Sequence, residues 1–485
     1  MYDLIVIGGG PAGVTAALRA RELGANVAII ERGLLGGTCT NDGCVPTRAL
    51  AKAARLMRDS EQFATYGLDA PRPTLDFTRL MARTQQVVYQ VQEKKQLIAH
   101  LQELNVDVFH NVGFARFVDP HTLALENGQT LSADKFIIAV GGHARKLDLP
   151  GAEHALTHSD VWRMTKLPAS AIIVGGGATG CQLASIFDTF GCKVTLIDIA
   201  PRILITEDQH ITDEMIDQFS RTGIEIITGI NAVNRIDKRP DRFLDVTFTY
   251  ADQPQTRTVE AVLLSVGWPG NLDALNLSAA NVATKGAYIQ VDDQLRTTAP
   301  HIFAVGDING RMMLVQSASH QARIAAENAI LGANRVDEMA LVPHGGFTDP
   351  EYGSVGLTEE QARGQYPVAV AMVPYADMDR AVIDGRPVGF CKLIVHRETR
   401  LILGAHVVGE QAVEVIQIIA AAVAGDMRIE GLAELEFAYP TFAAIIGVAA
   451  RQIARELNVV PTDKSSLPRW SELAKIRLAE WERRE

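Results

Sequence analysis

The sequence has no excess of basic residues and no long apolar run. With 46 Lys and Arg against 57 Asp and Glu, its net charge is −11, which argues against nucleic acid as a partner because phosphate contacts need clustered Lys and Arg. Its longest apolar run, Ile418 to Ala424, falls far short of the roughly 20 residues that span a bilayer. No basic region precedes the first expected strand, which begins near residue 3, so neither export nor membrane association is expected. We therefore predict a cytoplasmic protein.

A nucleotide-binding pattern occupies the first 31 residues. An apolar run of strand length enters a glycine-rich turn, and an alanine-rich helix leads to a second apolar run that ends at Glu31. Gly8, Gly10 and Gly13 allow a tight turn and let a pyrophosphate approach the helix N-terminus, where unpaired N–H groups favour anions. An acid about twenty residues later accepts a ribose hydroxyl in this motif, which is the role predicted for Glu31.

The same unit occurs a second time, with Gly175, Gly177 and Gly180 followed by Asp198. The separation from the first glycine to the acid is 23 positions in both units, so the chain contains an internal repeat. Two dinucleotides on one chain provide what is needed to pass a hydride from a soluble nicotinamide to a tightly held flavin.

Cys39 and Cys44 follow the first unit directly, in the run GGTCTNDGCVPTR. A zinc site would need about two more ligands, and no nearby CxxC or HxxxH supplies them. In a reducing compartment a structural disulfide is also improbable, so redox chemistry is the better interpretation. Pro46 fits the first turn of a helix, which would place a thiolate at Cys44 near the positive helix end and lower its pKa.

Further motifs make the chain similar to the flavin-dependent pyridine nucleotide–disulfide oxidoreductases, over residues 1 to about 460. They are FIIAVGG, LLSVGWPGN, TTAPHIFAVGDI and FTDPEYGSVGLTEEQAR. The resemblance implies an α/β fold with two Rossmann-like dinucleotide-binding domains, one for FAD and one for NAD(P), followed by a C-terminal α+β dimerisation domain. The length of the chain agrees, because roughly three domains are expected for 485 residues. The expected ranges are 1–149 and 276–340 for the FAD domain, 150–275 for the NAD(P) domain, 341–460 for the dimerisation domain and 461–485 for a helical extension.

The resemblance also implies residue roles. Cys44 would contact the flavin, and Cys39, expected to be the more exposed thiol, would attack the substrate. Asp307 would bond the flavin ribityl chain. No resident metal is expected. The residues expected to bind the two cofactors are Gly8, Gly10, Gly13, Glu31, Gly37, Thr38, Gly141, Gly306, Asp307, Gly175, Gly177, Gly180, Asp198 and Gly267.

One departure from the family lies near the C-terminus. Tyr439 and Ala444 stand where the family carries the His and Glu of its acid–base pair. A phenol with an ordinary pKa near 10 is a poor base near neutrality. Efficient reduction of lipoamide or glutathione disulfide is therefore not predicted, and a packing role for Tyr439 is the alternative to a catalytic one.

A second departure lies beside the flavin, where Arg48 and Gln182 replace the Lys and Glu of a family ion pair. A cation without its anion would favour an anionic reduced flavin or a nearby thiolate, so the sequence predicts a raised flavin potential. The alternative is a neutral hydrogen-bonded pair with little electrostatic effect.

The preferred nicotinamide nucleotide is predicted from Asp198. A carboxylate there accepts from the 2′-hydroxyl of NADH and repels the 2′-phosphate of NADPH. Arg202 is close enough in sequence to bind that phosphate, which keeps NADPH open.

The tail beyond residue 460 places Trp470, Ala474, Leu478 and Trp481 on one helical face. We expect this helix to pack on the dimerisation domain or on the other subunit.

Three functions remain open. The first is an NAD(P)H-dependent reductase that passes electrons through the flavin and the Cys39–Cys44 pair to a disulfide, a metal ion or another small electrophile. The second is a diaphorase or quinone reductase whose acceptor takes electrons from the flavin directly. The third is a non-catalytic redox sensor or complex subunit. A homodimer is expected because in the relatives the region around Tyr439 serves the neighbouring subunit's flavin.

Overall fold

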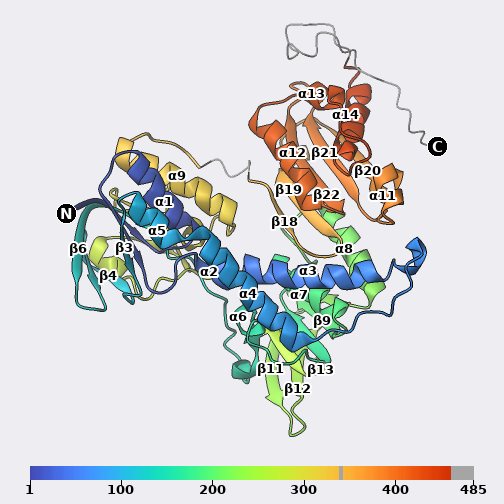
Figure 1. Cartoon of the computed structure of the whole chain (residues 1–485), viewed down its shortest axis with the longest axis horizontal. Coiled ribbons are helices and arrows are strands. Elements are labelled where there is room, and N and C mark those ends of the chain that lie inside the picture. Colours follow the sequence, from blue (N-terminus) through green and yellow to red (C-terminus); the bar gives the residue numbers. More distant parts are fainter. Residues whose placement is uncertain (338–341, 460–485) are drawn as a thin grey trace.

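The structure is a computed structural model that describes residues 1–337 and 342–459. It contains two largely parallel sheets in the first two thirds of the chain and an antiparallel sheet near the C-terminal end (Figure 1). This confirms the predicted α/β fold class with its C-terminal α+β part. The expected helix over 461–485 lies outside the described residues. Among those that are described, no helix is long and apolar enough to cross a bilayer.

The first sheet runs in the order β3-β2-β1-β6-β5-β4, and β17 pairs with β6. Its strands are β1 (Tyr2–Ile7), β2 (Val27–Glu31), β3 (Asp107–His110), β4 (Ala115–Asp119), β5 (Thr122–Leu125), β6 (Thr130–Ile138) and β17 (Ile302–Ala304). In β1, successive side chains such as Leu4 and Ile5 belong to different core clusters and are both fully buried. A strand covered on both faces reads as a continuous apolar run, as the sequence does here.

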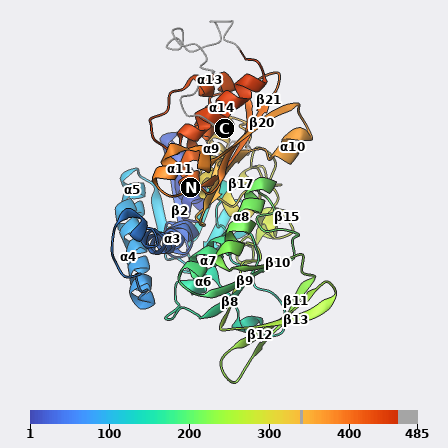
Figure 2. The same cartoon turned by 90° about the vertical axis from the view of Figure 1, so that its right-hand side faces the viewer.

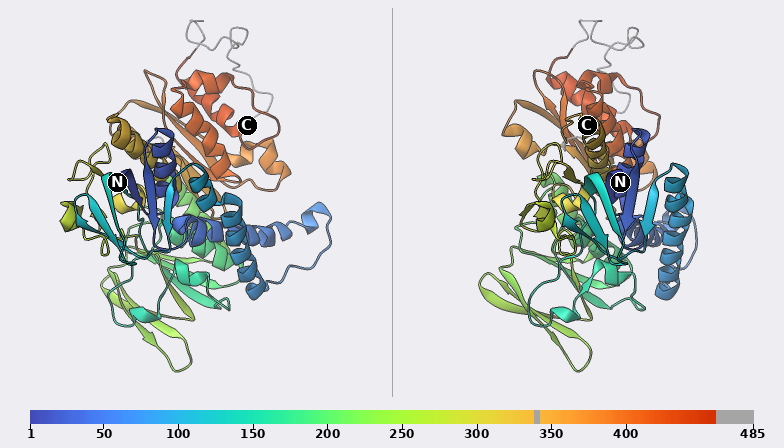
Figure 3. Two further views of the ribbon diagram at one scale, coloured as in Figure 1. Left: turned by 60° about the vertical axis from the view of Figure 1, so that its left-hand side comes forward. Right: turned by 90° about the vertical axis from the view of Figure 1, so that its left-hand side faces the viewer.

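Helices cover this sheet and lead away from it (Figures 1 and 3). On one face, α1 (Pro11–Glu22) packs against α9 (Val315–Leu331) and α5 (Leu97–Glu103). The short α2 (Gly37–Asn41) is followed by α3 (Cys44–Ser60) and α4 (Phe77–Lys95), which pack on one another. The Asp76 carboxylate caps α4 by accepting from the Arg79 N–H, as short acidic side chains do at helix starts.

The second sheet is entirely parallel, in the order β10-β9-β8-β14-β7. Its elements are β7 (Leu156–Thr157), α6 (His158–Val161), β8 (Ser170–Val174), α7 (Ala178–Thr189), β9 (Lys193–Asp198), α8 (Gln209–Thr222), β10 (Glu225–Thr228) and β14 (Ala261–Leu264). A separate antiparallel sheet, β11 (Ala232–Lys238), β12 (Leu244–Tyr250) and β13 (Gln253–Val259), projects from this part of the molecule (Figure 2). A two-stranded ribbon, β15 (Thr284–Lys285) and β16 (Tyr288–Ile289), follows.

The third sheet is antiparallel, in the order β18-β19-β22-β21-β20. Its strands are β18 (His344–Gly346), β19 (Glu351–Gly356), β20 (Val368–Pro374), β21 (Phe390–His396) and β22 (Ile402–Gly409). The helices of this part are α10 (Glu359–Arg363), α11 (Asp379–Ile383), α12 (Ala412–Ala424), α13 (Ile429–Glu434) and α14 (Ala444–Glu456). Of these, α12 and α14 cover one sheet face and share its core cluster. From the opposite face, Tyr352 and Phe390 join the core of the second sheet.

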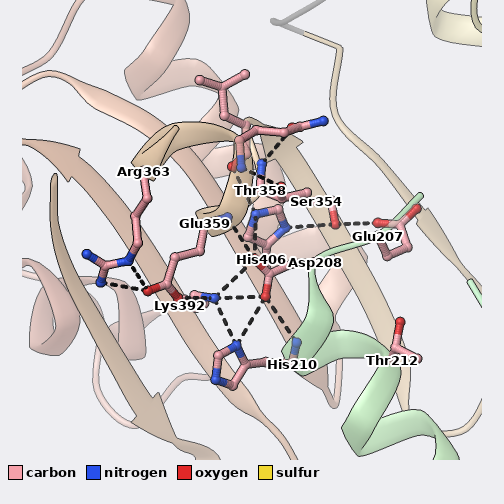
Figure 4. A network of polar contacts seen from close by, with 12 residues as sticks. Glu207, Asp208, His210, Thr212, Ser354, Thr358, Glu359, Arg363, Lys392 and His406 are labelled. Carbon is pink, nitrogen blue, oxygen red and sulfur yellow. Dashed lines mark hydrogen bonds and ion pairs between the residues drawn. The ribbon is translucent and has the colours of Figure 1, made fainter. Parts of the chain in front are cut away.

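A buried polar network ties the second and third sheets together (Figure 4). Lys392 on β21 is 1% exposed and donates to both oxygens of Asp208, at 2.8 and 3.0 Å. Asp208 precedes α8, accepts from the Glu359 N–H at 2.9 Å and lies 3.8 Å from His406. Although burial raises it, the pKa of Asp208 is held well below its ordinary value by His406, that N–H and Lys392. The buried charges are thus compensated.

Replacing Lys392 by methionine is expected to lower the free energy of unfolding by about 3–5 kcal/mol, because the buried Asp208 carboxylate loses its cation. Urea denaturation followed by tryptophan fluorescence measures the loss. Arg221→Met is the matched control, since Arg221 is 69% exposed in its pair with Asp217 and should cost less than about 1 kcal/mol. Equal losses for the two variants would contradict the expectation.

Candidate active site

The two glycine motifs adopt one backbone geometry. Gly8 and Gly175 have φ of +107° and +106°, a region that L side chains rarely adopt. A Cβ added to Gly13 would stand 1.7 Å from the Gly8 carbonyl oxygen, and one added to Gly180 would stand 1.8 Å from that of Gly175. No side chain fits at Gly13 or Gly180, so in both units the helix approaches the strand as closely as the motif requires.

The acids that end the two units are held alike. Glu31 accepts from the N–H of Gly9 at 2.7 Å and from that of Gly33 at 2.9 Å. Asp198 accepts from the N–H of Gly176 at 2.5 Å and from that of Ala200 at 2.8 Å. Both carboxylates therefore lie beside their glycine turns, where the sequence expected them to meet a ribose.

A cavity of about 1330 Å³ lies between the two units. It exceeds the roughly 300–1,000 Å³ of common small-molecule sites and so has room for a dinucleotide. The predicted residues that line it are Gly8, Gly10, Glu31, Gly37, Thr38, Cys39, Cys44, Gly141, Gln182, Gly306 and Asp307. The predicted residues that do not line it are Gly13, Arg48, Gly175, Gly177, Gly180, Asp198, Gly267 and Tyr439. The second unit borders the cavity instead through the start of α7, at Ala178 and Thr179.

Cys39 and Cys44 are free thiols that both line the cavity. Cys44 is the first residue of α3, as predicted. The neighbouring Cys39 thiol lowers the pKa of Cys44 to about 7. Cys44, together with burial, raises the pKa of Cys39 well above its ordinary value. Cys44 is exposed and Cys39 only partly exposed, so the prediction that Cys39 is the more exposed thiol was wrong: the first residue of α3 opens onto the cavity.

Helix α4 contacts the end of α2, the short helix that carries Cys39. Lys95 donates to the Thr40 hydroxyl at 2.8 Å, and Gln92 donates to the Asn41 side-chain oxygen at 2.6 Å. The Lys95 ammonium lowers the pKa of both thiols, whereas Asp307 raises them. The sequence did not identify Lys95, because nothing in an amphipathic helix indicates which exposed cation reaches α2.

The cavity residues fit a flavin dinucleotide. Gly37 lies so close to Gly10 that an added Cβ would stand 2.7 Å from the Gly10 Cα, which leaves an all-backbone surface for a phosphate. Asp307 lies three residues beyond the end of β17, and its partial burial raises its pKa. A partly buried carboxyl in the cavity wall can form hydrogen bonds with the hydroxyl groups of a bound chain. Asp307 and the Gly10–Gly37 contact would hold such a group, which supplies two-electron chemistry when bound.

Arg48 forms an ion pair, although the sequence predicted that it lacks an anionic partner. Its guanidinium pairs with Glu351 on β19 at 3.0 Å and lies 4.4 Å from the centre of the Phe347 ring. Gln182 instead donates to the Ala178 carbonyl and accepts from the Phe347 N–H. The expected uncompensated cation is therefore wrong, and with it the basis for a raised flavin potential, because a carboxylate from another domain replaces the missing Glu.

Tyr439 lies away from the cavity of its own chain. It is 55% exposed, and its hydroxyl donates to Asp379 at the start of α11.

The cavity residues that the sequence analysis did not single out include Asp42, His158, Trp268 and His344. Asp42 stands between the two cysteines, and Trp268 follows Gly267 in a motif that was recognised, so position in the sequence could have indicated both. His158 and His344 reach the cavity only through the packing of α6 and β18, for which the sequence has no signal.

Comparisons with known proteins agree with this geometry. The family model "Pyridine nucleotide-disulphide oxidoreductase" matches residues 2–322, and its dimerisation domain matches residues 342–450. Dihydrolipoyl dehydrogenase of Bacillus subtilis is 32% identical over 468 residues, 93% of this chain and 97% of the relative. Mercuric reductase of Lysinibacillus sphaericus is 32% identical over 463 residues, 94% and 83% of the two chains.

The fold is also shared with the solved HOCl-induced flavoprotein disulfide reductase RclA from Escherichia coli. The TM-score is 0.82 at 28% identity, over 93% of this chain and 99% of that one. RclA has been solved as a Cu(II) complex too, with a TM-score of 0.81. The repeated dinucleotide units, the paired thiols in the cavity and these matches show that the chain belongs to the pyridine nucleotide-disulphide oxidoreductase family of NAD(P)H-dependent flavoproteins.

Proposed function

We propose that this protein passes electrons from NADH through FAD to the Cys39–Cys44 pair and on to a disulfide or a thiol-reactive metal ion. The observation that carries the proposal is one cavity that is lined by both thiols, by the first glycine unit and by the start of α7 from the second. The neighbouring Cys39 lowers the pKa of Cys44 to about 7, which supports a thiolate there near neutral pH.

NADH is the proposed reductant because Arg202, the candidate phosphate ligand, is already engaged. Its guanidinium donates to the Thr212 hydroxyl and to the carbonyls of Ile205 and Glu207. Asp198, by contrast, keeps a carboxylate beside the second glycine turn.

Replacing Asp198 by serine is expected to lower the preference for NADH over NADPH by about 10- to 100-fold, the value of one charge-assisted hydrogen bond of about 1.5–3 kcal/mol. The ratio of kcat/KM for the two nucleotides measures it. Asp213→Ser, on the exposed side of α8, is the control. A ratio that does not change in Asp198→Ser would argue against the assignment.

The chemical class of the electron acceptor is proposed from the reactivity of the two thiols and from the relatives of this chain. Mercuric reductase and the Cu(II) complex of RclA support a metal ion, and the family supports a disulfide. A diaphorase that reduces its acceptor at the flavin is the second candidate, favoured by Tyr439 and Ala444, which replace the acid–base His and Glu of the family.

We further propose the domain limits given by the sequence: 1–149 with 276–340, 150–275, and 341–460. The pairing of β17 with β6 supports the return of the chain to the first domain. The dimerisation-domain match supports a homodimer, in which Tyr439 would face the partner.

Anaerobic titration with NADH tests the proposal. Uptake of four electrons per subunit is expected, two for the flavin and two for the thiol pair. Uptake of two electrons, with full turnover of a quinone, would favour the diaphorase. A protein that binds FAD but is reduced by neither nicotinamide would favour a redox sensor.

A further inference from the structure

A fully buried glutamine holds the turn that carries Gly306 and Asp307. Gln321 lies on α9, and its side-chain oxygen Oε1 accepts from the Gly306 N–H at 2.9 Å and from the Asn309 side-chain amide at 2.9 Å. The Asn309 amide also donates to the carbonyl of Ala304, the last residue of β17, at 3.2 Å. One amide oxygen therefore attaches both ends of the turn from Gly306 to Asn309 to helix α9.

This turn forms part of the cavity wall. Gly306 and Asp307 both line the cavity, and Gly306 has a φ of +74°, a region that L side chains rarely adopt. A Cβ added to Gly306 would stand 3.4 Å from the Cβ of Ala12, in the first turn of α1, and 3.4 Å from that of Ala318 on α9. The turn is thus enclosed between the helix that follows the first glycine motif and the helix that carries Gln321.

A buried carboxylate holds the other end of the Gln321 amide. The nitrogen Nε2 donates to the Oδ2 of Asp337 at 3.0 Å, and Arg311 lies 3.5 Å from the same oxygen while pairing with the exposed Asp293 at 3.0 Å. The Oδ1 of Asp337 has no hydrogen-bond partner among the residues that the structure describes. An ionised carboxylate only accepts, so Asp337 keeps the amide nitrogen on its own side and the amide oxygen toward Gly306.

We propose that Gln321 is a positioning residue of the flavin site, which fixes the Gly306–Asp307 turn against α9, and that Asp337 sets the orientation of its amide. This rests on the proposed function in one respect, because it assumes that the cavity holds FAD. Gln321 does not line the cavity, so it acts on the cofactor only through the turn.

The role requires an amide. The turn needs an acceptor and Asp337 needs a donor, and glutamine supplies both from one planar group. An ionised glutamate supplies acceptors only, and methionine, of similar length, supplies no donor and only a weak acceptor. If Gln321 only filled space in the core, neither replacement would change the affinity for FAD.

Gln321→Glu is expected to weaken FAD binding by about 10- to 100-fold at about pH 8.5, the value of a hydrogen bond to a charged group, because two carboxylates then face each other in the core. Two carboxylates that share a buried site keep one proton well above the ordinary carboxyl range. At about pH 5.5, still above the ordinary pKa values of Asp and Glu, the protonated pair can donate across the contact as the amide does. The affinity should therefore recover as the pH falls.

Two further variants keep the test readable if Gln321→Glu does not fold. Gln321→Met should lose about tenfold or more in FAD affinity at every pH, because the buried Gly306 N–H and Asp337 are left without their partner. Gln321→Glu combined with Asp337→Asn exchanges the carboxylate and the amide and should restore FAD binding at about pH 8.5. Arg323→Gln is the matched control: Arg323 is exposed on the same helix, and its loss lowers the charge of α9 by one unit, as Gln321→Glu does.

Equilibrium dialysis of each full-length variant against FAD, followed by flavin absorbance from about pH 5.5 to about pH 8.5, measures the affinity, and urea denaturation alongside identifies a general folding defect. FAD binding that is unchanged in Gln321→Met would overturn the proposal. So would a loss in Gln321→Glu that neither low pH nor Asp337→Asn relieves. Failure of the proposed function is distinguishable, because a wild type that binds FAD but takes up only two electrons from NADH leaves these affinities measurable. A wild type that binds no FAD would overturn both.

Discussion

Replacing either Cys39 or Cys44 by serine is expected to lower kcat/KM for NADH-driven disulfide reduction by at least about 1,000-fold, as the loss of a covalent nucleophile does in other enzymes. FAD should remain bound, because Gly10, Gly37 and Asp307, which line the cavity and would hold it, are unchanged. NADH uptake should fall from four electrons to two per subunit. Serine cannot form a disulfide, so the variant lacks the group that would accept the second electron pair.

The control for this prediction is Cys192→Ala. Cys192 is buried in the core of the second sheet, does not line the cavity, and has a pKa that burial raises to about 12. Its loss should leave four-electron uptake unchanged. Reduction of a disulfide at the wild-type rate by Cys44→Ser would show that the acceptor takes electrons from the flavin directly and would support the diaphorase.

Gly13→Ala and Gly180→Ala are expected to separate the two cofactors. Each new methyl group would lie within 1.8 Å of a carbonyl oxygen of its own turn, so the helix must move off the strand. Gly13→Ala should yield protein with little FAD. Gly180→Ala should bind FAD and be reduced by dithionite, while its kcat/KM for NADH falls by about 100-fold or more, since a displacement near 1 Å is enough for a loss of that size.

Flavin content by absorbance and stopped-flow reduction measure these effects. Gly364→Ala is the matched control, because Gly364 has no neighbour closer than 3.5 Å to an added Cβ and lies outside the cavity. Normal reduction of Gly180→Ala by NADH would mean that the second unit does not bind the nicotinamide nucleotide.

Much of the fold was predictable because its signals are local. Gly8 and Gly175 each begin a turn whose steric demand is satisfied within a few residues, and the strands around them are buried on both faces. The helix that starts at Cys44 and the lowered pKa of its thiol also follow from neighbours in the chain. Motif spacing therefore carried both the architecture and the location of the thiols.

The charge environment of the site was less predictable. Arg48 was expected to lack a partner because Gln182 replaces the family's glutamate, yet Glu351 from the third sheet pairs with it. A comparison of motifs considers only the two positions that form the ion pair in the family. It therefore gives no sign that a carboxylate elsewhere in the chain, here that of Glu351, can pair with Arg48 instead. The greater exposure expected of Cys39 failed for a similar reason, since exposure depends on which wall of the cavity each residue occupies.

By itself, the sequence determined that this chain carries two dinucleotide-binding units and a dithiol next to the first, because these features depend on glycines, acids and cysteines at short spacing. Only the tertiary structure decided that Asp42 meets His158, that Glu351 meets Arg48 and that Tyr439 turns away to Asp379. Those contacts join segments far apart in the chain. They depend on how the three sheets pack, which no local pattern of residues encodes.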